Sequence, residues 1–471
     1  MERRFETRKQ ELMDECKVGP DLFEQVPQRL RSFVKPFAKY LKTEAREEFT
    51  QMYVAGLASG LERKNVESIA YYHNQDRQPL QRFIGQMQWD HRPLLRELGR
   101  QVGAELGEPD AVIVFDPSAH SKKGDDSVGV QRQWSGRKGK IDNCQVGIYM
   151  GYVSRREQAL VDERLYLPKS WANQKKRRRK CGVPTEVKFA TRLELALDML
   201  QDQGSQLPHS WIAGDDEFGR STSFRRDLRA LNERYLLAVP SNTLVRDLEA
   251  EPPPYVGHGK QPLAPFVRVD RWDKSASEDA WTRVDVRDGE KGPLVVHVVT
   301  RRVLAITERK HRESEETLVI VRRLDEKGET FHDYYLSSAE AGTPAAEFAR
   351  VANAQHRIEE CIKRAKSEAG LSDYETRTWS GWHHHQTLSL LATWFLVQET
   401  QRGKKIDSGP DGSTAPRCTG PTPLCRNRST PGRPSRTRLP APLATQRTGQ
   451  VLPPQTTQRV SALTCSSTTI G

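Results

Sequence analysis

The sequence predicts an α/β fold, in which a mixed sheet is flanked by helices and carries a β-rich insertion. Three observations favour this fold. Apolar residues recur at three- and four-residue intervals over residues 20–105, strand-like and helical segments alternate over 111–239, and strong helical patterns return at 344–369 and 385–400. The length of 471 residues suits two or three domains.

The first region, residues 1–107, is predicted to be a helical N-terminal domain. Its helical stretches are 21–41, 43–61, 65–73, 77–89 and 93–106. The domain is a candidate for binding DNA ends, and the alternative is an ordinary helical packing domain. The sequence identifies no recognition helix, so both interpretations stay open.

The second region, residues 108–240, carries the main strands of the predicted sheet. The run AVIVFD at 111–116 is continuously apolar up to its final acid, which is typical of a buried strand. Further strands are expected at 145–153, 159–167, 211–215 and 235–239, and helices at 187–203 and 221–232. The order is three strands, helix, strand, helix, strand, which suits a mixed sheet.

Proline-rich turns and short apolar runs predict the β-rich insertion over residues 241–342. Its strands are expected at 294–300, 317–322 and 333–337. The helical patterns that follow, within 343–405, are assigned to the same domain as the sheet. We expect those helices to pack against it.

The last segment, residues 406–471, is predicted to be a disordered tail. From residue 408 onward it holds ten prolines, eight arginines and one aspartate, and it has no Lys, Glu, Phe, Tyr or Trp. Such a segment cannot bury enough apolar surface to offset its ordering entropy. Its composition indicates either translation in a shifted reading frame or a basic tail that binds nucleic acid.

The composition excludes a membrane protein and favours a polyanionic partner. Lys and Arg total 74 against 62 Asp and Glu, which gives a net charge of +12 and a pI near 9.3. A basic surface most often binds phosphates. Mean hydropathy is −0.73, no run approaches about 18 apolar residues, and the charged N-terminus is unlike a secretory signal. A cytoplasmic location is therefore expected.

Three acids occupy positions where a catalytic site is expected. Asp116 ends the first predicted strand, Asp215 ends the fourth, and Glu359 lies within the late helix. With this strand order the first and fourth strands can lie side by side, which places Asp116 beside Asp215. A carboxylate from a helix packed across the sheet would complete the all-oxygen site that Mg²⁺ and Mn²⁺ prefer. Taken singly, each acid is more often a capping or solvent-facing residue.

Basic side chains follow the first acid closely and are candidates for binding DNA phosphates. They are Lys122, Lys123, Arg132, Lys138 and Lys140, and a second basic run spans 175–180. A pair of metal ions held by the three acids would activate a water or a 3′-hydroxyl for attack at phosphorus.

Other metal sites are not indicated by the sequence. The seven cysteines are scattered and never form a C-x-x-C pair, so reduced thiols are expected. His383, His384 and His385 form a tract on a predicted helix. Adjacent residues of a helix point in different directions, so the three side chains are not expected to share an ion.

Five segments, taken in order, carry a family resemblance. They are VIVFDPSAHSKKG, SVGVQRQWSGRKGKIDNCQVGIYMGYV, WIAGDDEFGR, YLLAVPSN and RIEECIKRAKSEAGLSDYETRTWSGWHHH. Together they resemble insertion-sequence transposases of the DDE type, most closely the insertion sequence 701 group, whose catalytic domain is RNase H-like. The resemblance implies cut-and-paste movement of a DNA element by metal-dependent strand cleavage and joining, without a covalent enzyme–DNA intermediate.

The same resemblance assigns Asp116, Asp215 and Glu359 as the catalytic acids and as the ligands of two Mg²⁺ or Mn²⁺ ions. Asp216 is the competitor of Asp215, which is preferred because it lies four residues before a glycine in the family pattern.

The resemblance prefers Glu359 to Glu360, because the family glutamate is followed seven residues later by a basic residue. Lys366 holds that position. Seven residues are almost two helical turns, so Lys366 shares the face of Glu359 and could contact DNA.

The resemblance also implies the partners. These are the terminal inverted repeats and the target DNA, bound by a homodimer in a bacterial cytoplasm and nucleoid. Two alternatives stay open. One is a non-catalytic DNA-binding remnant, because Ala352 and Gln355 stand where related transposases often have an aromatic residue and an arginine. The other is a nuclease of the same fold that does not join strands.

Overall fold

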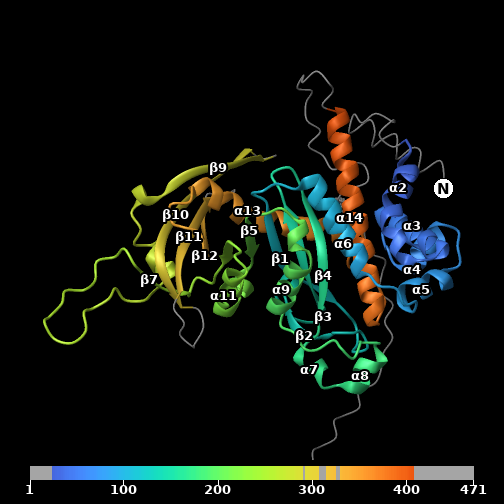
Figure 1. Cartoon of the computed structure of the whole chain (residues 1–471), viewed down its shortest axis with the longest axis horizontal. Helices are drawn as coiled ribbons and strands as arrows, with labels where there is room; N and C mark the ends of the chain where they lie inside the picture. Colours follow the sequence, from blue (N-terminus) through green and yellow to red (C-terminus); the bar gives the residue numbers. More distant parts are fainter. Residues whose placement is uncertain (1–23, 290–291, 307–313, 325–328, 408–471) are drawn as a thin grey trace, which may run out of the picture. The chain divides into compact units, whose positions relative to one another are not determined.

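The computed structural model describes residues 24–289, 292–306, 314–324 and 329–407, all within one structural unit (Figure 1). The predicted disordered tail lies outside the described residues from 408 onward. None of the described helices combines the length and the apolar character that a bilayer span needs.

In the part of the chain that the structure describes, five α-helices precede the sheet, which confirms the helical pattern predicted for the first region. They are α2 (Val26–Ala38), α3 (Glu44–Ala58), α4 (Val66–Tyr72), α5 (Arg77–Gly85) and α6 (Arg92–Leu106). Side-chain caps fix three of their starts, because Thr43, Asn65 and Asp76 each accept a hydrogen bond from a backbone N–H of the first turn. These caps explain why the helices begin close to the predicted positions.

The sheet begins with the strands predicted for the second region and one more. They are β1 (Val112–Ser121), β2 (Gln131–Ser135), β3 (Lys140–Val153), β4 (Gln158–Tyr166), β5 (Trp211–Gly214) and β6 (Tyr235–Ala238). Strands β1, β5 and β6 are parallel neighbours, whereas β3 runs antiparallel to β1 and β4. The spatial order β4-β3-β1-β5-β6 confirms the predicted RNase H-like mixed sheet.

Short helices connect these strands. They are α7 (Lys169–Ala172), α8 (Lys175–Lys180), α9 (Arg192–Gln203), α10 (Asp216–Gly219) and α11 (Thr222–Ala230). Helix α9 packs on β3 and β4, and α10 packs on β5 and β6. The predicted alternation of strand and helix is therefore present.

The β-rich insertion continues the same sheet. It contains β7 (Leu244–Asp247), β8 (Val267–Arg268), α12 (Val269–Asp273), β9 (Thr282–Gly289), β10 (Gly292–Ile306), β11 (Ser314–Leu324) and β12 (Thr330–Ser337). Strand β12 pairs antiparallel with β6. This pairing joins the strands of the insertion to β1–β6 in one sheet, which has twelve strands in the described part of the chain. The insertion is thus built onto the sheet edge through backbone hydrogen bonds.

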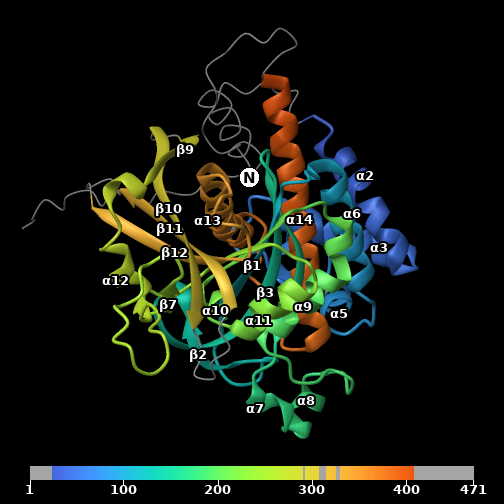
Figure 2. The ribbon, with the colours of Figure 1, turned by 60° about the vertical axis from the view of Figure 1, so that its left-hand side comes forward.

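Two long helices follow and pack against the strands (Figure 2). Helix α13 (Ala345–Glu368) contacts β1, β3 and β4 as well as the insertion strands β9 and β10. Helix α14 (Trp379–Asp407) packs on β4 and on the N-terminal helices α3 and α5. One continuous buried cluster contains apolar residues of the N-terminal helices, the sheet, α13 and α14. The N-terminal helices therefore share a core with the sheet.

Candidate active site

Asp116 lies in β1, but it does not end that strand as the sequence indicated. Pairing with β3 continues from Asp116↔Tyr149 through Ser121↔Cys144. The long strand β3 supplies these partners. Pairing of β1 with β5 stops at Phe115, so the later part of β1 has an open edge, where Pro117 is tolerated.

Asp116 and Asp215 lie side by side, as the predicted strand order requires. The last paired residues of the parallel strands β1 and β5 are Phe115 and Gly214, and each acid is the next residue along its strand. Burial raises the pKa of Asp116 well above its usual range, and the negative charges of Asp215 and Glu359 raise it further. The three acids are therefore electrostatically coupled.

Asp215 also caps a short helix, which is the structural role that the sequence left open for it. Its carboxylate accepts a hydrogen bond of 2.9 Å from the Glu217 backbone N–H at the start of α10. Burial, followed by the charges of Glu217 and Asp216, raises the pKa of Asp215 to about 7. Asp216 is exposed and forms an ion pair with Arg220. This arrangement favours Asp215 over Asp216 as the member of the site.

Glu359 is carried to the site by α13. The helix packs closely on the sheet through buried residues that include Ile358, and Gly151 of β3 lies directly beneath that side chain. A Cβ at Gly151 would overlap Ile358, so glycine is needed for the close approach. Glu359 is exposed to solvent; partial desolvation raises its pKa, whereas His356 and Arg323 lower it. The structure thus brings the third predicted acid toward the other two.

The donor set of the three acids fits a hard divalent cation. All three offer carboxylate oxygens, and the pKa of each is raised by burial. A cation would relieve the cost of charging them together. Among the described residues they do not form a group whose ligand atoms all lie within 4.8 Å of one another, a spacing that a different group reaches.

Lys366 reaches the same site from α13. Its Nζ donates to Ser118 Oγ at 2.6 Å, and its charge lowers the pKa of Asp116. Ser118 lies two residues after Asp116 on β1, so both side chains point to the same side of the sheet. The predicted shared face of Glu359 and Lys366 therefore faces the first acid.

Lys122 turns inward instead of facing solvent. Its Nζ donates to the Tyr374 carbonyl oxygen at 2.9 Å and lies 3.3 Å from the centre of the Tyr374 ring. Burial lowers the pKa of Lys122 to about 8. The placement gives no support to a phosphate contact by Lys122.

The other predicted DNA-binding cations lie on or next to the hairpin of β2 and β3. Lys123, Arg132, Lys138 and Lys140 are exposed, and Lys138 forms an ion pair of 2.7 Å with Asp142. Trp134 of the same hairpin is 61% exposed. The hairpin thus presents several cations and an aromatic ring to solvent.

A cavity of about 500 Å³ adjoins the third acid and was not predicted. It lies between α13 and the insertion strands, and its lining includes Glu359, His356, Arg323 and Tyr335. No spacing rule links these distant positions, although Tyr335 does fall in a predicted strand.

Residues 36–293 match the sequence profile of a family described as DDE superfamily endonuclease. The chain belongs to this family. The match includes Asp116 and Asp215 of this DDE endonuclease and ends before Glu359. The position of Glu359 near the two aspartates is therefore supported by the structure alone. The family implies DNA as the substrate and a divalent metal ion as the cofactor. No curated protein matches the chain.

Proposed function

We propose that this DDE endonuclease is a DNA transposase that moves an insertion sequence by cut-and-paste strand cleavage and joining. The carrying observation is the register of β1 and β5, which makes Asp116 and Asp215 neighbours at the point where their pairing ends. Glu359 and Lys366 approach the same point from one helix face. We place the chain in the insertion sequence 701 group on the segments that span residues 111–396.

In this proposal Asp116, Asp215 and Glu359 hold two Mg²⁺ or Mn²⁺ ions. When bound, such a pair supplies Lewis-acid activation of the attacking oxygen and of the leaving oxygen. Without a cation, burial and neighbouring charges raise the pKa of Asp116 well above its usual range and that of Asp215 to about 7, so both groups hold a proton more tightly than exposed carboxyls do. The chain's own contribution is to preorganise the carboxylates on rigid elements and to position the scissile phosphate.

Cationic side chains complete the proposed substrate site. Lys366 stands beside Asp116, where it can approach a phosphate oxygen near the reacting atoms. Lys123, Arg132, Lys138 and Lys140 would bind the backbone of the terminal inverted repeats and of the target DNA without reading sequence. A homodimer that holds two element ends in the bacterial nucleoid is part of the same proposal.

The test is an assay of cleavage and strand transfer with the full chain. Its substrates are duplexes that carry the element ends bordering the gene, with Mg²⁺ or Mn²⁺. Asp116→Asn, Asp215→Asn and Glu359→Gln should each lower cleavage by about a thousandfold or more, because metal ligands supply several kcal/mol of transition-state stabilisation. The neighbouring variants Asp216→Asn and Glu360→Gln are matched controls and should stay within a few-fold of wild type.

Three results would contradict the proposal in different ways. Cleavage without joined products would indicate a nuclease of the same fold. Salt-sensitive DNA binding with no cleavage in either metal would indicate a non-catalytic remnant. Full cleavage by Asp116→Asn or Asp215→Asn would show that the reaction occurs elsewhere.

A further inference from the structure

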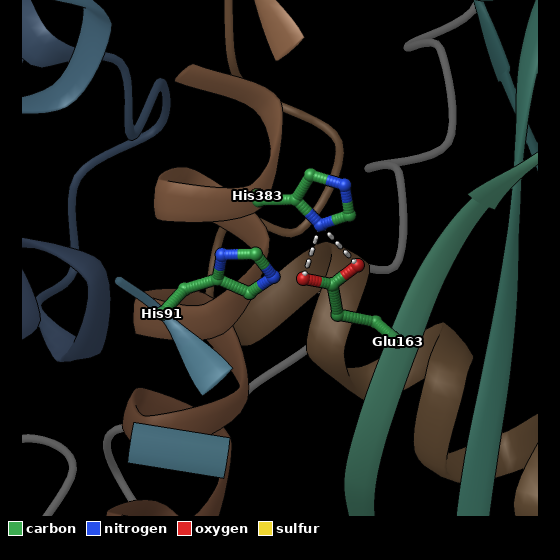
Figure 3. A group of neighbouring side chains, drawn as sticks. All are labelled: His91, Glu163 and His383. Carbon is green, nitrogen blue, oxygen red and sulfur yellow. Dashed lines mark hydrogen bonds and ion pairs between the residues drawn. The ribbon is translucent and has the colours of Figure 1, made fainter. Parts of the chain in front are cut away.

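A second group of metal-ligating side chains lies apart from the three acids. His91 immediately precedes α6, Glu163 lies in β4, and His383 lies in α14 (Figure 3). One ligand atom from each lies within 4.8 Å of the others, and in the described part of the chain this is the group of His, Cys, Asp or Glu that meets that spacing. Figure 3 shows one ring nitrogen of His91 and Nδ1 of His383 facing the Glu163 carboxylate.

The carboxylate of Glu163 is fully buried and is shared with an imidazole. Both of its oxygens lie close to His383 Nδ1, at 3.0 and 3.1 Å, and one accepts a hydrogen bond of 3.4 Å from Thr387 Oγ1. Burial raises the pKa of Glu163 well above its usual range. A buried carboxylate of this kind is costly unless a proton or a cation neutralises it.

The nearest arginines are engaged with other acids. Arg164 pairs with Asp162 and lies 3.4 Å from Asp202, and Arg92 lies 3.2 Å from Asp202. Asp162 and Arg164 are two residues apart on β4 and lie on one face, whereas Glu163 faces α14. The arginines thus form their ion pairs with Asp162 and Asp202, although their charges still lower the pKa of Glu163.

Two buried ring nitrogens at this group have no hydrogen-bond partner among the described residues. They are Nε2 of His91 and Nε2 of His383. Buried polar atoms are rarely left without a partner, because burial removes their hydrogen bonds to water and an unreplaced hydrogen bond destabilises the fold. The His91 atom is the one that faces Glu163 in Figure 3.

We propose that His91, Glu163 and His383 bind one Zn²⁺ ion. Two imidazole nitrogens and one carboxylate form a donor set that suits zinc, whereas Mg²⁺ prefers oxygen ligands alone. The rings of His91 and His383 are stacked, with centroids 4.4 Å apart and planes 16° from parallel. One ring must therefore turn about its Cβ–Cγ bond when the ion binds, and the proton held between His383 and Glu163 is released.

Both rings are ready to act as neutral ligands. Burial lowers the pKa of His91 and of His383 well below the usual value, and Arg92 and Arg164 lower both further.

The burial of the site indicates a structural role for the ion. Glu163 and His383 are 0% and 2% exposed and His91 is partly buried, so access to the ion is restricted. The three ligands come from the N-terminal helical region, the sheet and the last long helix. A bound ion would therefore tie these three parts together and stabilise the folded chain.

The test is zinc binding by the full chain, measured as metal content after gel filtration and by competition with a chromophoric chelator. We expect about one tightly held Zn²⁺ per chain and a higher melting temperature in its presence. Glu163→Gln and His91→Ala should weaken zinc binding by at least about a hundredfold, because loss of even outer-shell partners typically costs 10–100-fold in metal affinity. Cleavage activity is not needed for this readout, so the result is independent of the proposed function.

Two matched controls define the site. His209→Gln removes another partly buried His–Glu pair, 3.1 Å from Glu233, and should leave zinc binding unchanged. Asp116→Asn with Asp215→Asn removes the catalytic acids and should also retain the zinc. Wild-type chain without stoichiometric zinc, or a folded Glu163→Gln variant that keeps it, would overturn the proposal.

X-ray absorption of zinc-bound wild type covers the case in which a variant fails to fold. The expected spectrum has two imidazoles and an oxygen ligand at about 2.0–2.2 Å. A spectrum with sulfur ligands, or without imidazole, would overturn the proposal as well.

Discussion

Two groups of side chains each have one member in the same row of the sheet and differ in ligand chemistry and access. Asp116 pairs with Tyr149, and Tyr149 pairs with Glu163, so the three residues lie side by side across β1, β3 and β4. The acid group at the β1 end offers only oxygen ligands and adjoins a cavity next to Glu359. The group at the β4 end offers two nitrogens and one carboxylate, and it is more deeply buried, with Glu163 and His383 almost inaccessible to solvent.

Under the two proposals, one sheet positions a metal site for strand cleavage and a second metal site that stabilises the fold. A reacting phosphate needs access and hard ions that keep water in their coordination shell. A structural ion needs burial and ligands that hold it tightly. Tyr149 stands between the two sites, where its hydroxyl donates to Gln386 at 2.7 Å and contacts His120 Nε2 at 2.8 Å.

The largest expected effect is that of removing Mg²⁺ from the acid site while Zn²⁺ stays bound at the histidine site. Treatment with a weak chelator that removes Mg²⁺ should lower cleavage by about a thousandfold or more, because charge stabilisation by the ions is lost. The melting temperature should change little until a chelator strong enough to take zinc is used. Cleavage and calorimetry on the same samples measure both effects, and a simultaneous loss would contradict the separation.

Gly151→Ala should damage the acid site alone. The added Cβ overlaps Cδ1 and Cγ1 of the buried Ile358, so this side chain must repack, and we expect α13 to shift with it and to move Glu359 relative to Asp116. A displacement of about 1 Å costs on the order of a hundredfold in rate. Zinc affinity should stay within a few-fold of wild type, and an unchanged cleavage rate would show that the helix position is not limiting.

Lys366→Ala should have a smaller effect. The variant removes the hydrogen bond to Ser118 and a positive charge near Asp116. A charged hydrogen bond is worth about 1.5–3 kcal/mol, which corresponds to roughly a tenfold to hundredfold loss of cleavage. Lys363→Ala, an exposed position on the same helix, is the matched control and should leave the rate unchanged.

The pH dependence of stability should show the smallest effect. The pKa of Asp215 rises from a usual 3.8 to about 7 on folding, so the folded state binds this proton more tightly. The resulting stabilisation is complete below pH 3.8 and is lost as the pH rises to about 7. Without divalent ions, Asp215→Asn should therefore raise the melting temperature by a few degrees at pH 8 relative to wild type, and by less at pH 4.

Much of the fold could be predicted because apolar runs mark buried strands and helix faces. The run at 111–116 and the periodicity of the N-terminal helices both match observed elements. The strands of the insertion are longer than predicted, because polar residues continue the backbone pairing beyond the apolar runs. In β11 the buried run is followed by Arg322 and Arg323, which still pair with β12, and it is preceded by Ser314 and Glu315, which pair with β10. Strands pair through backbone N–H and C=O groups, so the pattern of side chains does not show where the pairing ends.

The sequence predicts that Asp116 and Asp215 lie side by side, but it does not predict the contacts of the residues around them. The sequence predicts that the first strand ends at Asp116, yet Ser118 and His120 are buried residues of the same strand with partners on α13 and β3. The three side chains of the histidine tract contact different partners, because adjacent residues of a helix point in different directions. The partnership of His383 with His91 and Glu163 spans about 290 residues of sequence, so no local spacing could indicate it.

The shared row of Asp116, Tyr149 and Glu163 also links both groups to one folding event. A shift of β3 by a single residue against its neighbours would reverse the side on which its residues face. Both clusters would then lose their alignment at once. The amount of zinc bound per chain should therefore measure the fraction of molecules in which β3 has the correct register. That measurement requires no cleavage assay.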